Sequence, residues 1–358
     1  MFRIGSSSNK SAGKEEKMKP KAIDVFAGCG GLTTGLKKAG FAVVAGIEVD
    51  HSASRVFKLN HPTTHLWSED IVGLSTRRIK SKLGVRVGEL DLLAGCPPCQ
   101  GFSRVRTLNG GYLISDERNE LIFEFARLIR TLKPKAVMLE NVPALADDAR
   151  MHQFKSELTS LGYSVRSKVL DVADYGVPQR RRRLILLAGR DGEIAFAKPA
   201  RVRRTVRDAI GKLPNAGTSG DGAHDIPELR SKKIQKLISL IPKNGGSRKD
   251  LPSRYQLECH KKCDGFKDVY GRMAWDEVSP TLTTGCFNPS KGRFLHPEED
   301  RNVTMREAAL LQTFPKSYVL PADLGKSILA KQIGNALPPE FVRRHAKSVR
   351  RYLSKPKP

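Results

Sequence analysis

Short apolar runs alternate with helix-forming stretches along the first half of the chain, and this alternation restricts the possible folds most. Between residues 21 and 190, the candidate strands are Ala22–Ala27, Ala42–Glu48, Leu90–Ala94, Ala136–Glu140, Val165–Leu170 and Leu184–Ala188. Runs so rich in leucine and β-branched residues are typical of strands buried on both faces. Strands that alternate with helices predict a doubly wound, mostly parallel α/β sheet.

The expected helices lie between these strands and again near the end of the chain. One is predicted over Glu117–Thr131, where the apolar face is formed by Leu121, Phe125, Leu128 and Ile129. Two more are predicted at Met305–Gln312 and Ala330–Arg351. The regular pattern therefore stops after the first half and resumes near Thr304.

The intervening stretch, residues 201 to 272, is rich in Pro, Gly and polar residues, with 17 Lys plus Arg against 8 Asp plus Glu. It predicts a smaller, irregular, inserted domain with a basic face. The expected organisation is a disordered basic tail over 1–20, a first domain over 21–200, the inserted domain over 201–275, a return to the first domain over 276–352, and a tail over 353–358. Met18, directly before Lys19, is a candidate for the real or an alternative start.

The charge of the chain indicates a polyanionic partner. Its 63 Lys plus Arg and 37 Asp plus Glu give a formal net charge of +26. The alternative is a basic surface that only water contacts. Six cysteines in 358 residues do not form a disulfide framework and favour a reducing, cytoplasmic compartment. Neither a membrane span nor a secretory signal is expected from the apolar runs.

A glycine turn follows the first strand, in the run Ala27-Gly28-Cys29-Gly30-Gly31. Glycines at a strand-to-helix turn let the backbone approach a ligand closely. The second strand ends at Glu48, about 20 residues further on, where an acidic side chain can hold ribose hydroxyls. Asp70 ends a shorter edge segment. For Glu48 and Asp70 the alternative role is helix capping.

A cysteine pair follows the strand Leu90–Ala94, in the run Gly95-Cys96-Pro97-Pro98-Cys99-Gln100-Gly101-Phe102-Ser103. The two prolines stiffen the turn at which the chain leaves the sheet. A thiolate placed there can attack an electrophilic carbon held above the sheet edge. Burial or metal binding are the alternatives. No metal is expected, since Cys259, His260 and Cys263 lack a second pair of ligands nearby.

In these and four further blocks the chain resembles the cytosine-C5 DNA methyltransferases, of the bacterial modification type. The further blocks are Glu140-Asn141-Val142, Gln179-Arg180-Arg181-Arg182-Arg183, Arg306-Glu307-Ala308-Ala309 with Leu311-Gln312-Thr313-Phe314-Pro315, and Gln332-Ile333-Gly334-Asn335-Ala336. The resemblance covers Lys21 to Pro339. It implies a Rossmann-like fold, S-adenosylmethionine as cofactor, and residues 201–275 as the target-recognition domain.

The resemblance also implies roles for individual residues. Cys99 is the expected nucleophile, Glu140 contacts the N3 edge of cytosine, and Arg181 and Arg183 brace the nucleophile and the target nucleotide. The residues expected to bind the cofactor are Phe26, Gly28, Gly30, Glu48, Val49, Asp70, Ile71, Pro98 and Asn335. Those expected to contact DNA are Gln100, Ser103, Arg104 and Arg106. From its residues alone, Glu140 equally suits an ion pair with a nearby arginine.

The partner that the resemblance implies is double-stranded DNA, from which the target cytosine is flipped out. The segment Ser103 to Arg118 is predicted to close over it. A monomer in the bacterial cytosol is expected, with a separately encoded restriction endonuclease as a possible cognate. Two rival functions stay open: a tRNA cytosine-5 methyltransferase of the same fold, and a DNA-binding protein without turnover.

Overall fold

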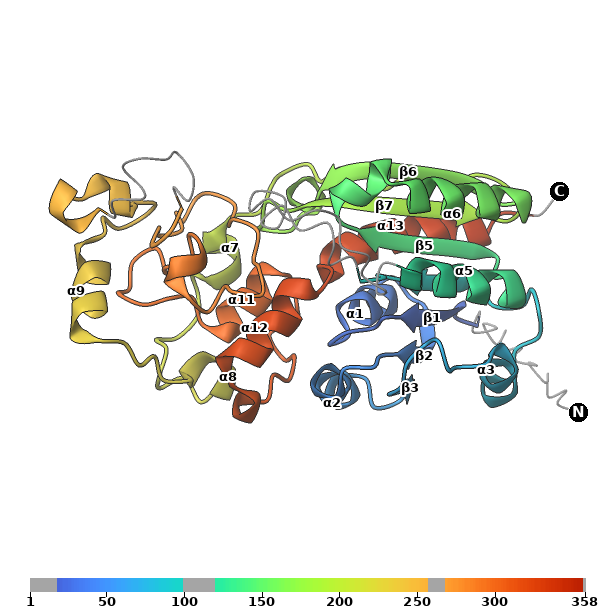
Figure 1. The fold of residues 1–358 in the computed structure, drawn as a ribbon, viewed down its shortest axis with the longest axis horizontal. Coiled ribbons are helices and arrows are strands. Elements are labelled where there is room, and N and C mark those ends of the chain that lie inside the picture. The colour runs from blue at the N-terminus through green and yellow to red at the C-terminus, as the bar shows by residue number, and fades with distance from the viewer. Residues whose placement is uncertain (1–17, 99–119, 257–267, 357–358) are drawn as a thin grey trace, which may run out of the picture.

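The structure is a computed structural model that describes residues 18–98, 120–256 and 268–356. Its centre is a seven-stranded sheet in the order β3-β2-β1-β4-β5-β7-β6 (Figure 1). The strands are β1 (Lys21–Val25), β2 (Ala42–Ile47), β3 (His65–Trp67), β4 (Leu92–Gly95), β5 (Ala136–Asn141), β6 (Ser164–Asp171) and β7 (Arg182–Gly189). The six predicted strands are confirmed, and β3 is the short edge segment before Asp70.

The sheet is mostly parallel, as predicted, and β7 is the strand that runs against its neighbours. It pairs antiparallel with β5 on one side and with β6 on the other. Opposite Glu140 in β5 lies Ile185 of β7. The start of β7 therefore lies at the edge of the sheet where the parallel strands end, and it brings the residues that precede it to that edge.

Helices cover both faces of the sheet (Figure 1). One face packs against α1 (Gly31–Lys38) and α13 (Pro339–Leu353), and the other against α3 (Thr76–Leu83), α5 (Leu121–Leu132) and α6 (Ala149–Ser160). Alternate strand residues enter opposite clusters: Ile185 packs with the α1 and α13 side, and Leu186 with the α5 and α6 side. The strands are thus buried on both faces, which explains their apolar sequences.

The expected face of α5 is inside, with Phe125, Leu128 and Ile129 buried. The expected residues 117–119 lie outside the described residues. The prediction of a helix at Met305–Gln312 is confirmed as α11 (Met305–Leu311).

The single helix expected over Ala330–Arg351 is wrong. Two helices occupy this stretch, α12 (Gly325–Asn335) and α13, separated by an extended Ala336 with ψ 144°. The cause is the pair Pro338-Pro339. A proline lacks an N–H and disfavours helical geometry in the residue before it, whereas it suits the first turn of a new helix.

The second region, residues 201–303, is irregular. Its helices are α7 (Val206–Ile210), α8 (Gly222–Asp225) and α9 (Lys232–Leu240), and within its described residues the strand pairing consists of isolated bridges. Side chains of α7 and α8 share an apolar cluster with α11 and α12, while α13 packs on α1. The remaining elements are α2 (His51–Asn60) and the 3-10 helices Pro143–Asp147, Val172–Tyr175, Arg248–Asp250, Ser253–Tyr255, Pro289–Lys291 and Ala322–Leu324.

Candidate active site

A cavity of about 610 Å³ opens at the edge of the sheet where β1, β2, β4 and β5 end. Its wall brings together most of the residues predicted from the sequence: Phe26, Gly28, Glu48, Val49, Asp70, Ile71, Pro98, Glu140, Arg181, Arg183 and Asn335. Gly30 is not part of the lining. The predicted nucleophile Cys99 and the predicted DNA contacts Gln100, Ser103, Arg104 and Arg106 lie outside the described residues.

The glycine turn after β1 depends on left-handed backbone. Phe26, Gly28 and Gly30 have φ of 61°, 54° and 92°. A Cβ on Gly28 would meet nothing within 4 Å, so the backbone there faces open space, whereas a Cβ on Gly30 would lie 2.6 Å from Nε2 of His61. Gly28 thus leaves room for a ligand, and Gly30 lets the turn pack closely against the protein behind it.

Glu48 holds this turn against the tip of β2. Its Oε2 accepts a hydrogen bond from the Gly28 N–H at 2.8 Å, and its Oε1 accepts one from the Asp50 N–H at 2.7 Å. Burial raises the pKa of Glu48. Glu48 does not cap α2: that role belongs to Asp50, which accepts from the N–H groups of Ser52 and Ala53.

Asp70 is exposed at the rim of the cavity. Its Oδ1 accepts from the Val72 N–H at 3.0 Å, so the carboxylate also stabilises the local turn. Val49, beside Glu48, is 58% exposed although it is apolar. An exposed apolar side chain and a carboxylate on one wall suit a ligand with a flat ring and polar edges.

Asp24 lies beneath the glycine turn and is fully buried. Its Oδ2 accepts from the Thr33 hydroxyl at 2.6 Å, which ties β1 to α1. Among the described residues, its Oδ1 has no hydrogen-bond partner. Burial raises the pKa of Asp24 to about 7, and the nearby Glu48 adds to the rise. From the sequence, no role is predicted for Asp24.

Two further residues support the turn from behind and were missed from the sequence. The Tyr318 hydroxyl donates to the Cys29 carbonyl, and Nε2 of His61 lies 3.3 Å from both the Gly30 carbonyl and that hydroxyl. Burial and the charge of Lys37 together lower the pKa of His61 to about 4. No sequence pattern signals this cluster, because the tyrosine and the turn are 289 positions apart.

The chain leaves β4 through Cys96, Pro97 and Pro98, which line the cavity. The side-chain amide of Asn141, at the end of β5, donates to the Pro97 carbonyl at 3.0 Å. This bond fixes the proline turn to the neighbouring strand directly before position 99. Asn141 was part of a recognised motif but had no predicted role. Burial, with Glu140 close by, raises the pKa of the Cys96 thiol.

Glu140 and Arg183 form an ion pair across β5 and β7, with 2.8 Å between Oε1 and Nε. Both side chains are largely buried and both line the cavity. Glu140 therefore forms the ion pair with a nearby arginine that its residues alone suggested, and this ion pair lies in the cavity wall. A carboxylate with a fixed guanidinium partner has a defined orientation.

Arg181 lies on the same side as Arg183, whereas Arg180 and Arg182 are exposed, as the alternation along a strand predicts. Arg181 is buried and donates to the carbonyls of Leu282 at 3.0 Å and Gly334 at 2.8 Å. Its Nε has no partner among the described residues. Burial lowers the pKa of Arg181 to about 9, and the charge of Arg183 contributes.

The bonds of Arg181 join three parts of the chain: β7, the segment around Leu282, and the end of α12. A second buried connection lies beside this one: Nε2 of Gln179 donates to Oε1 of Gln312 at 3.0 Å. Gln179 also accepts from the Leu282 N–H, and Gln312 donates to the Ile333 carbonyl at 2.7 Å. The wall of the cavity near Asn335 is thus anchored to the sheet through buried polar groups.

The described residues contain no group of three or more His, Cys, Asp or Glu side chains placed to hold a metal ion. Cys259, His260 and Cys263 lie outside the described residues. None of the described helices is long and apolar enough to cross a membrane.

A seven-stranded sheet with one reversed strand and a cavity at its carboxyl edge defines an α/β protein of the Rossmann-like methyltransferase class. Solved structures agree: a prophage-encoded Escherichia coli protein, assigned as a DNA modification methyltransferase, matches with a TM-score of 0.72 over 94% of this chain and 100% of its own, at 24% identity. At that identity the likeness concerns the fold alone.

Sequence comparison goes further. Residues 20–351 match the family described as C-5 cytosine-specific DNA methylase. The chain is 38% identical to the Type II methylase M.HgiDII of Herpetosiphon aurantiacus, over 92% of this chain and 95% of that protein. It is 33% identical to the Type II methyltransferase M1.HphI of Haemophilus parahaemolyticus, over 91% and 86%. The chain belongs to the C-5 cytosine-specific DNA methylase family.

Proposed function

We propose that this enzyme takes a methyl group from S-adenosylmethionine and transfers it to carbon 5 of a cytosine flipped out of duplex DNA. The observation that carries this proposal is the convergence on one cavity of the glycine turn, the tips of β2 and β3, the proline turn and the Glu140–Arg183 pair. The glycine turn and the tips of β2 and β3 suit a nucleoside, and the proline turn and the Glu140–Arg183 pair suit a reactive base. Bound there, S-adenosylmethionine supplies an electrophilic methyl group.

The residues present fit that cofactor. Gly28 offers open space above its backbone, and Glu48 presents a carboxylate held by two N–H groups for the ribose. Val49 and Ile71 give apolar surface for the adenine, with Phe26 beside it, and Asp70 accepts from the adenine amine. Gly30 keeps the turn in position, and Pro98 and Asn335 bound the methionine end.

The proposed nucleophile is Cys99. Its thiolate adds to carbon 6 of the cytosine, which makes carbon 5 reactive enough to take the methyl group. Loss of the proton from carbon 5 and cleavage of the sulfur–carbon bond then restore the ring. A thiol has a pKa near ~8.5, so neighbouring cations that favour the thiolate speed the first step. Asn141 directs the proline turn that leads to position 99.

Glu140 is proposed to act on the N3 edge of the same ring. Negative charge develops at N3 when sulfur adds, and a carboxyl group can supply the proton or donor that N3 needs. Arg183 orients that carboxyl through its 2.8 Å contact. Arg181, buried and bonded to two carbonyls, braces the floor beside it.

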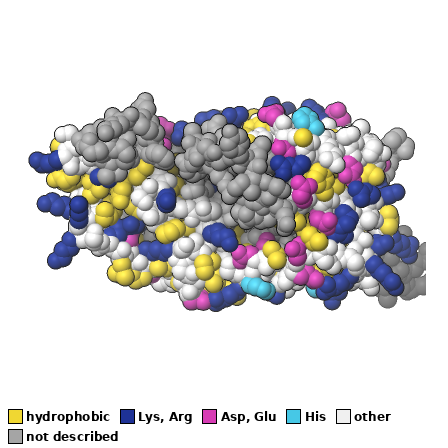
Figure 2. Space-filling view, viewed as in Figure 1, with side chains coloured by type: hydrophobic (Ala, Val, Ile, Leu, Met, Phe, Trp, Pro, Cys, Tyr) yellow, Lys and Arg dark blue, Asp and Glu magenta, His cyan; other side chains and the backbone are white. Residues whose placement is uncertain are grey.

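Duplex DNA is the proposed partner, and the charge of the chain supports this choice. Besides the net charge of +26, Lys and Arg side chains gather at the end of the molecule that carries α9, where Lys232, Lys233 and Lys236 are exposed (Figure 2). We assign target recognition to residues 201–275. The segment from Ser103, with Gln100, Arg104 and Arg106, is proposed to contact the DNA and close over the flipped base.

The relatives suggest the biological setting. Because M.HgiDII and M1.HphI are named Type II enzymes, we place this chain in a restriction–modification system, acting as a monomer in the bacterial cytosol with a separately encoded nuclease. Such an enzyme methylates one short DNA sequence throughout the chromosome. That sequence is read by contacts with base edges in the second region.

The test is bisulfite sequencing of DNA from cells that express the protein, with tRNA from the same cells analysed alongside. Wild type is expected to methylate one DNA motif, and Cys99→Ser to lose this methylation while still binding S-adenosylmethionine. Cys286→Ala, which alters a buried thiol outside the cavity, is the matched control. Methylation of tRNA alone, or full activity of Cys99→Ser, would contradict the proposal. Duplex containing 5-fluorocytosine should become covalently attached to wild type and to Cys286→Ala, but not to Cys99→Ser.

A further inference from the structure

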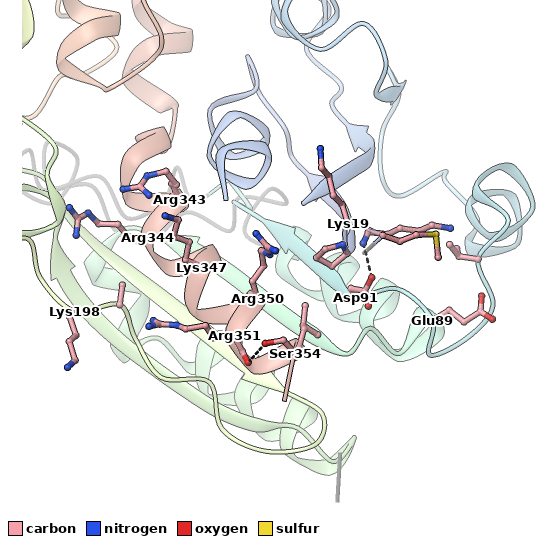
Figure 3. A pocket seen from close by; sticks show the side chains of 16 residues that line it. Lys19, Glu89, Asp91, Lys198, Arg343, Arg344, Lys347, Arg350, Arg351 and Ser354 are labelled. Carbon is pink, nitrogen blue, oxygen red and sulfur yellow. Dashed lines mark hydrogen bonds between the residues drawn. The ribbon is translucent and has the colours of Figure 1, made fainter. Parts of the chain in front are cut away.

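A second hollow, of about 870 Å³, lies at the opposite end of the sheet from the active site (Figure 3). We call it the α13 groove. It is bounded by residues 18–21 before and at the start of β1, by the turn that precedes β4, by Lys198, and by the outer side of α13. Its basic lining residues are Lys19, Lys21, Lys198, Arg343, Arg344, Lys347, Arg350 and Arg351.

The acidic side chains of the groove do not neutralise these cations. The groove contains two, Glu89 and Asp91. Asp91 is occupied by the side chain of Lys135, which is not part of the lining, and by the backbone N–H of Lys21, each at 2.7 Å. Glu89 accepts from the backbone N–H of Arg86. On α13 itself, Glu340 pairs with Arg343 at 2.6 Å and with Arg344 at 3.0 Å. The other six cations still give the groove a positive potential.

The cations of α13 follow a helical spacing. Arg343, Lys347 and Arg350 are four and three residues apart, which places successive charges on one side of the helix about 5–6 Å apart. Like charges so arranged repel each other. Among the described residues, Lys347 has no hydrogen-bond or ion-pair partner, and neither have Lys19 and Lys198. These cations are available to a ligand.

The groove continues toward the second region. A neighbouring hollow is lined by Lys38, Arg204 and Arg344, and Arg344 is common to both. The basic track thus runs along α13 from the amino end of the sheet to the beginning of the second region. A ligand with charges at regular intervals fits such a track better than a single small anion does.

The apolar side of α13 is already covered. Phe341, Val342, Ala346 and Val349 are buried in the cluster that α13 shares with α1. A membrane-binding helix inserts its apolar face into the lipid, and α13 has none to offer. The exposed side of α13 is charged, which favours a phosphate backbone.

The groove and the active site lie at opposite ends of the strands. β1 separates them, because Lys21 at its start lines the groove and Phe26 just past its end lines the cavity. Five residues of strand span roughly 17 Å, so DNA that lies across the carboxyl ends of the strands does not reach the groove at their amino ends. A polyanion in the groove is therefore a separate segment.

We propose that the α13 groove binds the phosphate backbone of a second duplex DNA segment, independently of sequence, while the active site is engaged with or searching for its target. The inference rests on the proposed function only in taking DNA as the substrate. On long DNA this second contact keeps the enzyme attached when the active site releases one segment, so that the next is found without full dissociation.

The test compares two triple variants of equal charge. Lys19→Gln, Lys198→Gln and Lys347→Gln remove three groove cations, and Lys58→Gln, Lys82→Gln and Lys168→Gln remove three exposed lysines elsewhere. Both are made in a Cys99→Ser background, and binding to a non-cognate duplex is measured by fluorescence anisotropy as salt is varied. The groove variant is expected to reduce the slope of log affinity against log salt by roughly 2 to 3, and the control variant by less than one.

Activity gives the second readout, with Cys99 restored. On a short cognate duplex that fills only the active site, the groove variant should match wild type. On plasmid DNA, its methylation rate should be several-fold lower than that of wild type. Each binding event should also leave more target sites on the plasmid unmethylated. Equal slopes for the two triple variants, or equal losses on short and long DNA, would overturn the groove proposal. If wild type methylates no DNA at all, the proposed function is wrong, whereas the binding comparison of the two triple variants still tests the groove proposal.

Discussion

The sheet and the second region bury their polar groups in different ways. In the sheet, strand pairing satisfies the backbone, and apolar side chains fill the space between strands and helices. In the described part of the second region, strand pairing is limited to isolated bridges. There a buried arginine side chain donates hydrogen bonds to backbone carbonyls that strand pairing leaves without a partner. Arg272 is 0% exposed. The comparison shows that a basic residue can act as the centre of a core.

The guanidinium of Arg272 uses all five of its N–H donors. It donates to the carbonyls of Ile241 at 3.0 Å, His296 at 3.1 Å, Glu299 at 2.5 Å and Ile238 at 2.8 Å, and to the Asp300 carboxylate at 2.5 Å. Five is the full capacity of an arginine side chain. Segments far apart in the chain are thereby held together without a ladder of strands.

Asp24 is the contrasting buried charge in the sheet. It has one side-chain hydrogen-bond donor, Thr33, and its second oxygen has no partner among the described residues. Burial therefore favours its neutral form, as its raised pKa shows. A buried ionisable group stabilises a fold when its partners are complete, and limits the stable pH range when they are not.

The largest expected effect is that of Arg272→Met. It removes the side-chain donor of the Ile241, His296 and Glu299 carbonyls. Asp300 keeps Lys243 and the Ile238 carbonyl keeps the Ile241 N–H, so we expect the second region to lose about 3–5 kcal/mol of stability while the sheet stays folded. Hydrogen exchange that resolves the two regions measures this. Arg201→Met, at an exposed position of the same region, is the control and should have little effect. A variant as stable as the control would remove Arg272 from the centre of this core.

The next largest effect concerns pH. The unfolded chain binds the Asp24 proton only below about pH 4, whereas the folded chain holds it up to about pH 7. The stabilisation this gives is complete at low pH and is lost as pH rises toward 7. Asp24→Asn cannot ionise, so relative to wild type it should gain roughly 2–3 kcal/mol between about pH 5 and pH 8.

Urea unfolding at the two pH values measures this change. Asp147→Asn, at an exposed carboxylate, is the matched control and should follow wild type at both pH values. If Asp24→Asn shows the same pH dependence as wild type, the contrast between the two buried charges does not hold.

The smallest of the three effects tests the buried hydrogen bond between Gln179, before β7, and Gln312, at the end of α11. Gln312→Met removes the acceptor of Gln179 and the donor to Ile333, which should cost about 1–3 kcal/mol and loosen the wall near Asn335. We expect a several-fold higher KM for S-adenosylmethionine with little change in kcat. The exposed Gln153→Met is the control. Loss of kcat with an unchanged KM would assign Gln312 to another task.

The sheet could be predicted because its physics is local. Each strand is indicated by several consecutive apolar residues. Ile185 and Leu186 of β7 face opposite apolar clusters, as the alternation along a strand requires. The break before α13 was missed although Pro338 and Pro339 signal it, because the apolar pattern on both sides suggested one helix. For the second region, the sequence predicted only that the structure would be irregular. The burial of Arg272 could not be predicted, because its hydrogen-bond acceptors are carbonyls from segments far apart in the chain.

Residues in motifs next to strand ends, such as Glu48 and Glu140, line one cavity, because the topology brings strand ends together. His61 and Tyr318 act through the backbone of the glycine turn, and nothing in their own neighbourhood indicates this. The roles of the assigned residues in catalysis stay predictions until the variants are made.

The reversed direction of β7 leaves the chain free to change elsewhere. Since this strand starts beside the reacting groups and finishes at Gly189 on the far side, the crossing into the second region departs from the non-catalytic edge. Extra or missing residues in that crossing leave the Arg183–Glu140 pair where it is, and Arg181 keeps its place while the Leu282 carbonyl is retained. We therefore expect residues of the second region away from Leu282 to vary without disturbing the cavity wall.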